Sequence, residues 1–96
     1  MRRVVAVRTI EDCFDGSYIR EFELDEPMDE TLMFRLADGG ELRYYPHFPR
    51  PYYCIRLAGQ VQIQGVIGLP SFRVTFGTSA GPEAVDALKQ LIEEVT

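Results

Sequence analysis

The chain has 96 residues, of which 46% are hydrophobic, and a formal net charge of −5. This length supports one hydrophobic core and so a single domain over residues 1–96, and the composition excludes a disordered chain. The acidic balance argues against binding to duplex nucleic acid or to an anionic membrane, because both require clustered cations.

The chain has two cysteines, Cys13 and Cys54. Two cysteines make a poor disulfide framework, and the apolar run near the start is too short for a secretory signal or a membrane span. We therefore expect a reduced, cytoplasmic protein. Together with His47 these cysteines offer three potential zinc ligands, but there is no close pair of cysteines among them, so we expect neither a metal nor a cofactor.

The N-terminal half predicts four strands, the first of which begins at about residue 2. The turn residues at 15–17 separate this strand from residues 18–24, which form the second strand. Residues 41–45 (ELRYY) form the fourth strand. The third strand comes from a segment that is consistent with two structures.

That segment runs from residue 27 to residue 37. As a strand it points alternate apolar side chains to one side and ends in a hairpin signal, Asp-Gly-Gly, at residues 38–40. As a short helix it begins near a proline and ends at a glycine, with Met28, Leu32 and Leu36 four residues apart. We predict the strand, because the hairpin signal and the two-residue period agree.

The stretch RYYPHFPRPYY, residues 43–53, joins the two halves. Its three prolines lack backbone donors and stiffen the chain, so we expect a crossing from a first sheet to a second. Tyr44 and Tyr53 are expected to point inward, which leaves several aromatic and basic side chains without a structural role. These side chains are Tyr45, His47, Phe48, Arg50 and Tyr52.

Aromatic and arginine side chains contribute most of the binding energy at protein interfaces, so this group is the predicted binding site. The alternative is that the rings only cover an exposed edge and pack against the prolines.

Three strands follow at residues 52–58, 60–64 and 71–76, each with alternating polar and apolar side chains, which is typical of an antiparallel sheet with one wet face. The last element is an amphipathic helix at about residues 82–95, with its apolar side chains on one stripe.

Together these elements predict a mainly β (α+β) fold. It has seven antiparallel strands over about residues 2–76, arranged as a four-plus-three barrel or roll, and the C-terminal helix covers one open end. This order of elements resembles the pleckstrin-homology (PH-like) superfold over nearly the whole chain, without a shared motif. The resemblance implies a phosphoinositide site at the loop between the first two strands. Here that loop carries Glu11, Asp12 and Asp15, which would repel a phosphorylated headgroup.

A second candidate site precedes the C-terminal helix. Free amides at a helix N-terminus can hold an anion. The residues involved would be Gly77, Thr78, Ser79 and Gly81. The alternative is that these small residues only form the turn and cap of the helix.

We predict no catalytic residues, because the single histidine lacks an obvious orienting acid. The chain is therefore interpreted as a non-catalytic binding domain, with a protein or peptide as its partner. One alternative is a small-molecule or anion site at the barrel mouth near residues 77–81. Another is single-stranded nucleic-acid binding through rings and arginines, which the net charge disfavours. We expect a monomer or a weak homodimer, because an unclosed sheet leaves the backbone of its edge strand unpaired.

Overall fold

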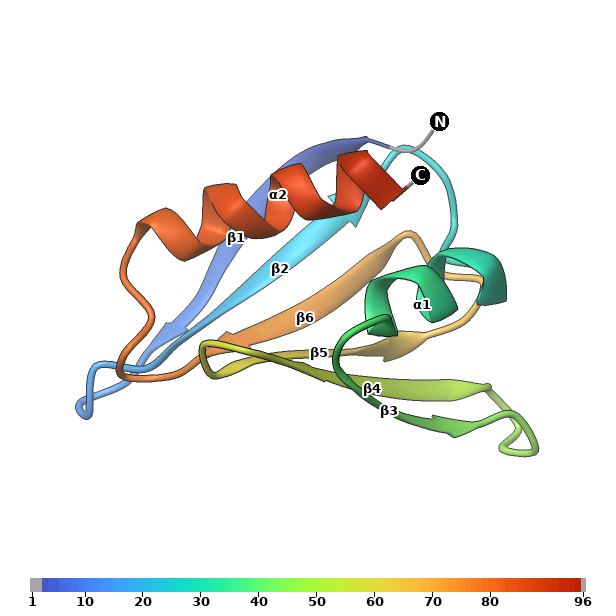
Figure 1. Ribbon diagram of the computed structural model, residues 1–96. Helices are drawn as coiled ribbons and strands as arrows, with labels where there is room; N and C mark the ends of the chain where they lie inside the picture. The colour runs from blue at the N-terminus through green and yellow to red at the C-terminus, as the bar shows by residue number, and fades with distance from the viewer. Residues whose placement is uncertain (1–2, 96) are drawn as a thin grey trace.

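The computed structural model describes residues 3–95, which form one antiparallel sheet of six strands and two helices (Figure 1). In chain order the elements are β1 (Val4–Asp12), β2 (Tyr18–Leu24), α1 (Glu30–Ala37), β3 (Glu41–Tyr45), β4 (Tyr52–Leu57), β5 (Val61–Val66), β6 (Ser71–Phe76) and α2 (Glu83–Val95). The strand order across the sheet is β1-β2-β6-β5-β4-β3. The β3–β6 meander thus joins the β1–β2 hairpin through the pairing of β6 with β2, and β1 and β3 are the two edges.

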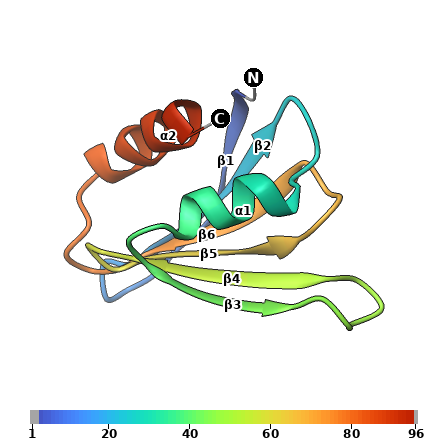
Figure 2. The ribbon, with the colours of Figure 1, turned by 45° about the vertical axis from the view of Figure 1, so that its right-hand side comes forward.

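Both helices lie on the same face of the sheet (Figures 1 and 2). The core between helices and sheet consists of apolar side chains that alternate along the strands and recur along the helices. Its buried members are Phe22, Leu24, Met28, Leu32, Met33, Leu36, Tyr53, Ile55, Ile63, Phe72, Val74, Phe76, Leu88 and Ile92. Neither helix has the length and apolar character needed to cross a membrane, as judged on the described residues.

The prediction of a strand at residues 27–37 is wrong, because this segment contains helix α1. The Asp29 side chain caps the helix by accepting a hydrogen bond from the Leu32 amide (2.8 Å). The Asp-Gly-Gly sequence ends this helix instead of forming a hairpin, and Gly39 adopts the positive φ of 82° that favours glycine. The helical spacing of Leu32 and Leu36 prevails because both side chains pack into the core.

The predicted barrel is also wrong: the sheet has six strands and does not close. Residues 43–53 do not cross between two sheets but form the β3–β4 hairpin of a single sheet. The dry face is covered by two helices, so the sheet does not need to roll onto itself, and α2 lies along this face. The first strand begins at Val4 in the structure, whereas residue 2, where we predicted its start, lies outside the described residues.

Other predictions are confirmed. The last three strands form the expected antiparallel meander, and the C-terminal helix buries Leu88 and Ile92.

Gly65 lies directly opposite the buried Tyr53 in an unbroken register. A Cβ atom at Gly65 would lie 2.5 Å from the Tyr53 hydroxyl oxygen, so the glycine makes room for the ring.

Candidate binding surface on the open sheet face

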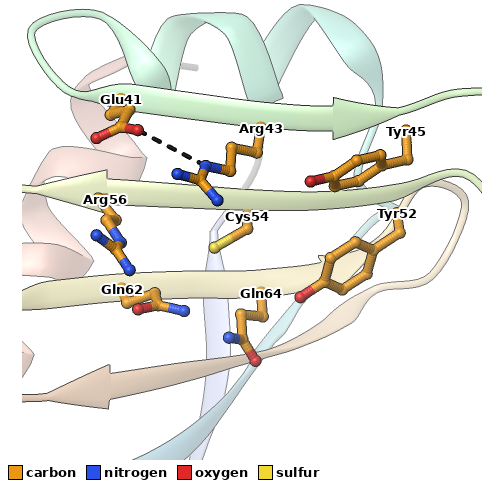
Figure 3. Close-up of a pocket in the computed structure, with 8 residues that line it drawn as sticks. All are labelled: Glu41, Arg43, Tyr45, Tyr52, Cys54, Arg56, Gln62 and Gln64. Carbon is orange, nitrogen blue, oxygen red and sulfur yellow. Dashed lines mark ion pairs between the residues drawn. The ribbon is translucent and has the colours of Figure 1, made fainter.

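The face of the sheet opposite the helices carries a shallow pocket of about 200 Å³ over β3, β4 and β5 (Figure 3). Its side chains come from alternate residues of each strand, because their neighbours in sequence point into the core. The lining residues are Glu41, Arg43, Tyr45, Tyr52, Cys54, Arg56, Gln62 and Gln64. The pocket is thus bounded by rings at one end and by charged and amide groups at the other.

Three aromatic rings form one end of this surface, and we call Tyr45, Phe48 and Tyr52 the ring cluster. Tyr45 and Tyr52 are direct cross-strand partners, with ring centroids 6.0 Å apart and nearly parallel planes. Phe48, from the β3–β4 turn, stacks on Tyr45 at 5.0 Å. Tyr45 is 39% exposed and Phe48 51%. The rings therefore pack on one another while presenting apolar surface to solvent.

Both tyrosines point their hydroxyls toward the polar end of the pocket (Figure 3). Burial raises the pKa of the Tyr52 hydroxyl above its usual value of 10.0, and the nearby Cys54 and Tyr45 add to the rise. Like any tyrosine hydroxyl with a pKa of 10.0 or above, that of Tyr52 is protonated at neutral pH. Its hydroxyl can donate a hydrogen bond to a bound group as well as accept one.

The charges of this face are only partly paired. Arg43 lies 3.7 Å from Glu41 on its own strand, and Arg8 pairs with Glu21 and Glu23 near the opposite edge. Within residues 3–95, the ion pairs include neither Arg56 nor Arg73. The centre of the open face thus offers guanidinium groups that can pair with an incoming carboxylate.

The structure brings together three of the five residues predicted from the sequence, namely the ring cluster. His47 and Arg50 lie exposed on the β3–β4 turn and do not line the pocket. Sequence reasoning missed the polar lining from β4 and β5, including Arg56 and Gln64. Alternate residues of a strand point to the same face of the sheet, so Arg56 shares the face of Tyr52 and Gln64 lies beside it on β5. This alternation could have identified both residues if the β3–β4 hairpin had been predicted.

The second candidate site, at residues 77–81, borders a groove of about 460 Å³ between α2 and the β4–β5 hairpin. The amides of Gly77 and Ser79 already donate to the backbone and side-chain oxygens of Gln60, respectively. The Glu83 carboxylate lies beside Gly81, so a negative charge stands where an anion would enter. The groove wall is formed largely by apolar side chains, which makes this the less favourable place for an anion.

The two cysteines are both free and lie apart in the fold, Cys13 beside the β1–β2 turn and Cys54 in the centre of the open face. Among residues 3–95, no three side chains of the metal-binding types gather in one place.

In comparisons with known proteins, no family model matches the chain, nor does any curated protein or solved structure. The resemblance to the PH-like superfold therefore stays a prediction.

Proposed function

We propose that this protein is a non-catalytic interaction domain that binds a segment of a cytoplasmic partner protein on the open face of its sheet. The observation that carries the proposal is the ring cluster, in which two of three stacked rings stay well exposed next to a pocket. Aromatic side chains in such positions supply contact area at a low cost in conformational entropy.

The size of the pocket supports a protein partner over a small molecule. Sites that enclose drug-sized molecules have volumes of roughly 300–1,000 Å³. The pocket here measures about 200 Å³ and is shallow, which suits one or two side chains of a longer segment. The neighbouring rings would extend the contact beyond the pocket itself.

The charges support a partner segment that carries carboxylates. Arg56 lines the pocket and Arg73 lies opposite Gln64 on the neighbouring strand β6, and neither belongs to an ion pair of the described residues. The acidic side chains that make the whole chain negative lie mainly in the β1–β2 region and on α2. At physiological ionic strength, charges more than about 8 Å apart are largely screened. Near the pocket the guanidinium groups of Arg43, Arg56 and Arg73 outnumber the carboxylates of Glu41 and Glu21.

The test compares what immobilised wild-type protein and two folded variants capture from a lysate of the source cells. One variant, Tyr45→Ala/Phe48→Ala, removes the exposed rings, and the matched control, Phe14→Ala, removes an exposed ring at the β1–β2 turn. We expect the wild type and the control to retain the same specific protein and the double variant to lose it. Equal capture by all three, or no capture, contradicts the proposal.

A second measurement distinguishes a protein partner from the alternative of a single-stranded nucleic acid. Fluorescence anisotropy of a labelled oligothymidine reports binding to single-stranded DNA, which uses stacked rings and cationic side chains on similar surfaces. We expect no binding at physiological salt, because the chain carries a net charge of −5. If the wild type binds the oligothymidine and Tyr45→Ala/Phe48→Ala does not, the proposal of a protein partner is contradicted and single-stranded nucleic acid is the ligand of this surface.

A further inference from the structure

The two edges of the sheet differ in regularity. The pairing of β1 with β2 has register shifts between Val4 and Ala6 and between Thr9 and Glu11. Such irregularities twist an edge strand and discourage pairing with another chain. The pairing of β3 with β4 runs without a shift over all five residues of β3. The β3 edge is therefore the regular one.

The backbone groups exposed at the β3 edge follow from the hydrogen bonds of β4. Pro51, just before β4, accepts a hydrogen bond from the Ile67 amide, just after β5 (2.9 Å). The N–H and C=O groups of successive strand residues point to alternate sides, so those of the odd-numbered residues of β4 point toward β5 and those of the even-numbered residues point toward β3. The even-numbered residues of β4 lie opposite the odd-numbered residues of β3. The N–H and C=O groups of Leu42 and Tyr44 therefore point outward, away from the sheet.

The side chains of β3 are complementary to themselves in one antiparallel register. A two-fold axis at Leu42 places Glu41 opposite Arg43 of the partner subunit, and Arg43 opposite Glu41 of the partner subunit. An axis at Arg43 would place two arginines opposite each other, and an axis at Glu41 two glutamates. Like charges directly opposite are destabilising, whereas opposite charges stabilise the pair. Of these three axes, only the one at Leu42 places opposite charges across from each other.

The same register agrees with the apolar side chains on the helix-covered side of β3. Leu42 is only partly buried at the border of the core and would meet Leu42 of the partner subunit. Next to this edge, Phe34 on α1 packs edge-on against Tyr44, with ring centroids 6.3 Å apart, and remains 56% exposed. A second copy at β3 would extend the apolar core across the axis.

We propose that two copies of the chain associate through antiparallel pairing of their β3 strands about a two-fold axis at Leu42. The two six-stranded sheets then form one continuous sheet, and the two open faces lie side by side. A five-residue strand is a small contact, typical of interfaces that form and dissociate readily. The pairing uses Glu41 and Arg43, which also line the pocket, but it does not use Phe48, Tyr52 or Arg56.

Charge reversal tests both the edge and the register, with analytical ultracentrifugation from micromolar to millimolar concentration as the readout. We expect the weight-average mass of the wild type to rise above that of the 11.0 kDa monomer with concentration. Glu41→Arg alone and Arg43→Glu alone should each remain monomeric, because each places like charges opposite one another. An equimolar mixture of the two should associate again, and so should the double variant Glu41→Arg/Arg43→Glu.

Two controls change charge by the same amount elsewhere: Asp86→Arg and Lys89→Glu on α2 should associate like the wild type. Circular dichroism confirms that each variant is folded, which we expect because the Glu41 and Arg43 side chains are about 60% exposed. A wild type that stays monomeric at every concentration overturns the proposal. Single variants that associate like the wild type, or a mixture that stays monomeric, overturn it as well.

Hydrogen exchange provides a readout that depends on the edge itself. The amides of Leu42 and Tyr44 should exchange more slowly at high protein concentration than at low concentration, because they donate across the axis only in the dimer. The amide of Val5 on β1 should show no such dependence. Concentration-dependent protection on β1 in place of β3 would assign the association to the other edge and overturn the proposal.

Discussion

The two faces of the sheet are built from the same strands and carry side chains of opposite character. On the covered face Tyr53, Ile55 and Ile63 are buried beneath the helices, and the buried side chains of residues 3–95 include no charged group. On the open face the same strands present arginine, glutamine and tyrosine around a shallow pocket. Burial of the side chains on the covered face therefore supplies most of the free energy of folding. The side chains of the open face contribute little to stability and are available for the proposed binding.

The largest expected effect comes from the covered face. Phe22 lies in the core with ring centroids 5.7 Å from Phe72 and 6.4 Å from Phe76. Phe22→Ala should lower the free energy of unfolding by about 3–5 kcal/mol, through lost burial and a residual cavity. Urea denaturation measures this loss. The adjacent open-face variant Glu21→Gln should stay close to the wild type, and an equal loss in both would contradict the division between the faces.

The second effect concerns the seam between β4 and β5 on the covered face. In Gly65→Ala the new Cβ atom would lie within 3 Å of the Tyr53 ring and of the Phe72 Cβ atom. We expect a loss of about 1–3 kcal/mol in unfolding free energy, because the core must shift to admit the methyl group. Thermal unfolding followed by circular dichroism detects it. Unchanged stability would show that the Tyr53 ring moves aside freely.

Tyr53→Phe should have a smaller effect of opposite sign. Among residues 3–95, no group hydrogen-bonds to the buried Tyr53 hydroxyl. Burying an unsatisfied hydroxyl is unfavourable, so its removal should raise the unfolding free energy by about 1 kcal/mol. Chemical denaturation compares the two proteins at neutral pH. A loss of stability would mean that the hydroxyl has a stabilising partner.

The same substitution sharpens the pH dependence. Burial raises the pKa of the Tyr53 hydroxyl well above its usual value of 10.0. In the unfolded chain this hydroxyl ionises near pH 10 while it remains protonated in the folded protein, so the wild type should lose stability as the pH rises above 10. Stability curves from pH 8 to 11 should fall less steeply for Tyr53→Phe. Parallel curves would show that other tyrosines cause the loss.

The smallest effect on stability is expected on the open face. Arg56 is exposed and forms no ion pair within residues 3–95. Arg56→Gln should change the unfolding free energy by less than about 0.5 kcal/mol, since surface substitutions away from special features have little effect. The same variant should weaken capture of the proposed acidic partner. A variant with lower stability and unchanged capture would break the comparison between the two faces.

Residues of the candidate site were predictable where the local pattern was strong. Tyr45, Phe48 and Tyr52 stand out by residue type and by their lack of an expected inward position, and the structure clusters them. Arg56 and Gln64 belong to the same surface only because hairpin pairing aligns their strands with Tyr45. That alignment depended on treating residues 43–53 as a hairpin, and the three prolines had favoured a crossing between sheets.

The sequence by itself determined the two-residue alternation of the strands, the apolar stripe of α2 and the turn that separates β1 from β2, because these depend on neighbouring residues. Tertiary structure decided that the segment of Leu32 and Leu36 is a helix, because the helical form covers the β3–β4 side of the core. It also decided that β6 returns to β2 and that the sheet stays open. The reason is that two helices already cover the dry face, and pairing between distant strands depends on the whole core, which no local pattern encodes.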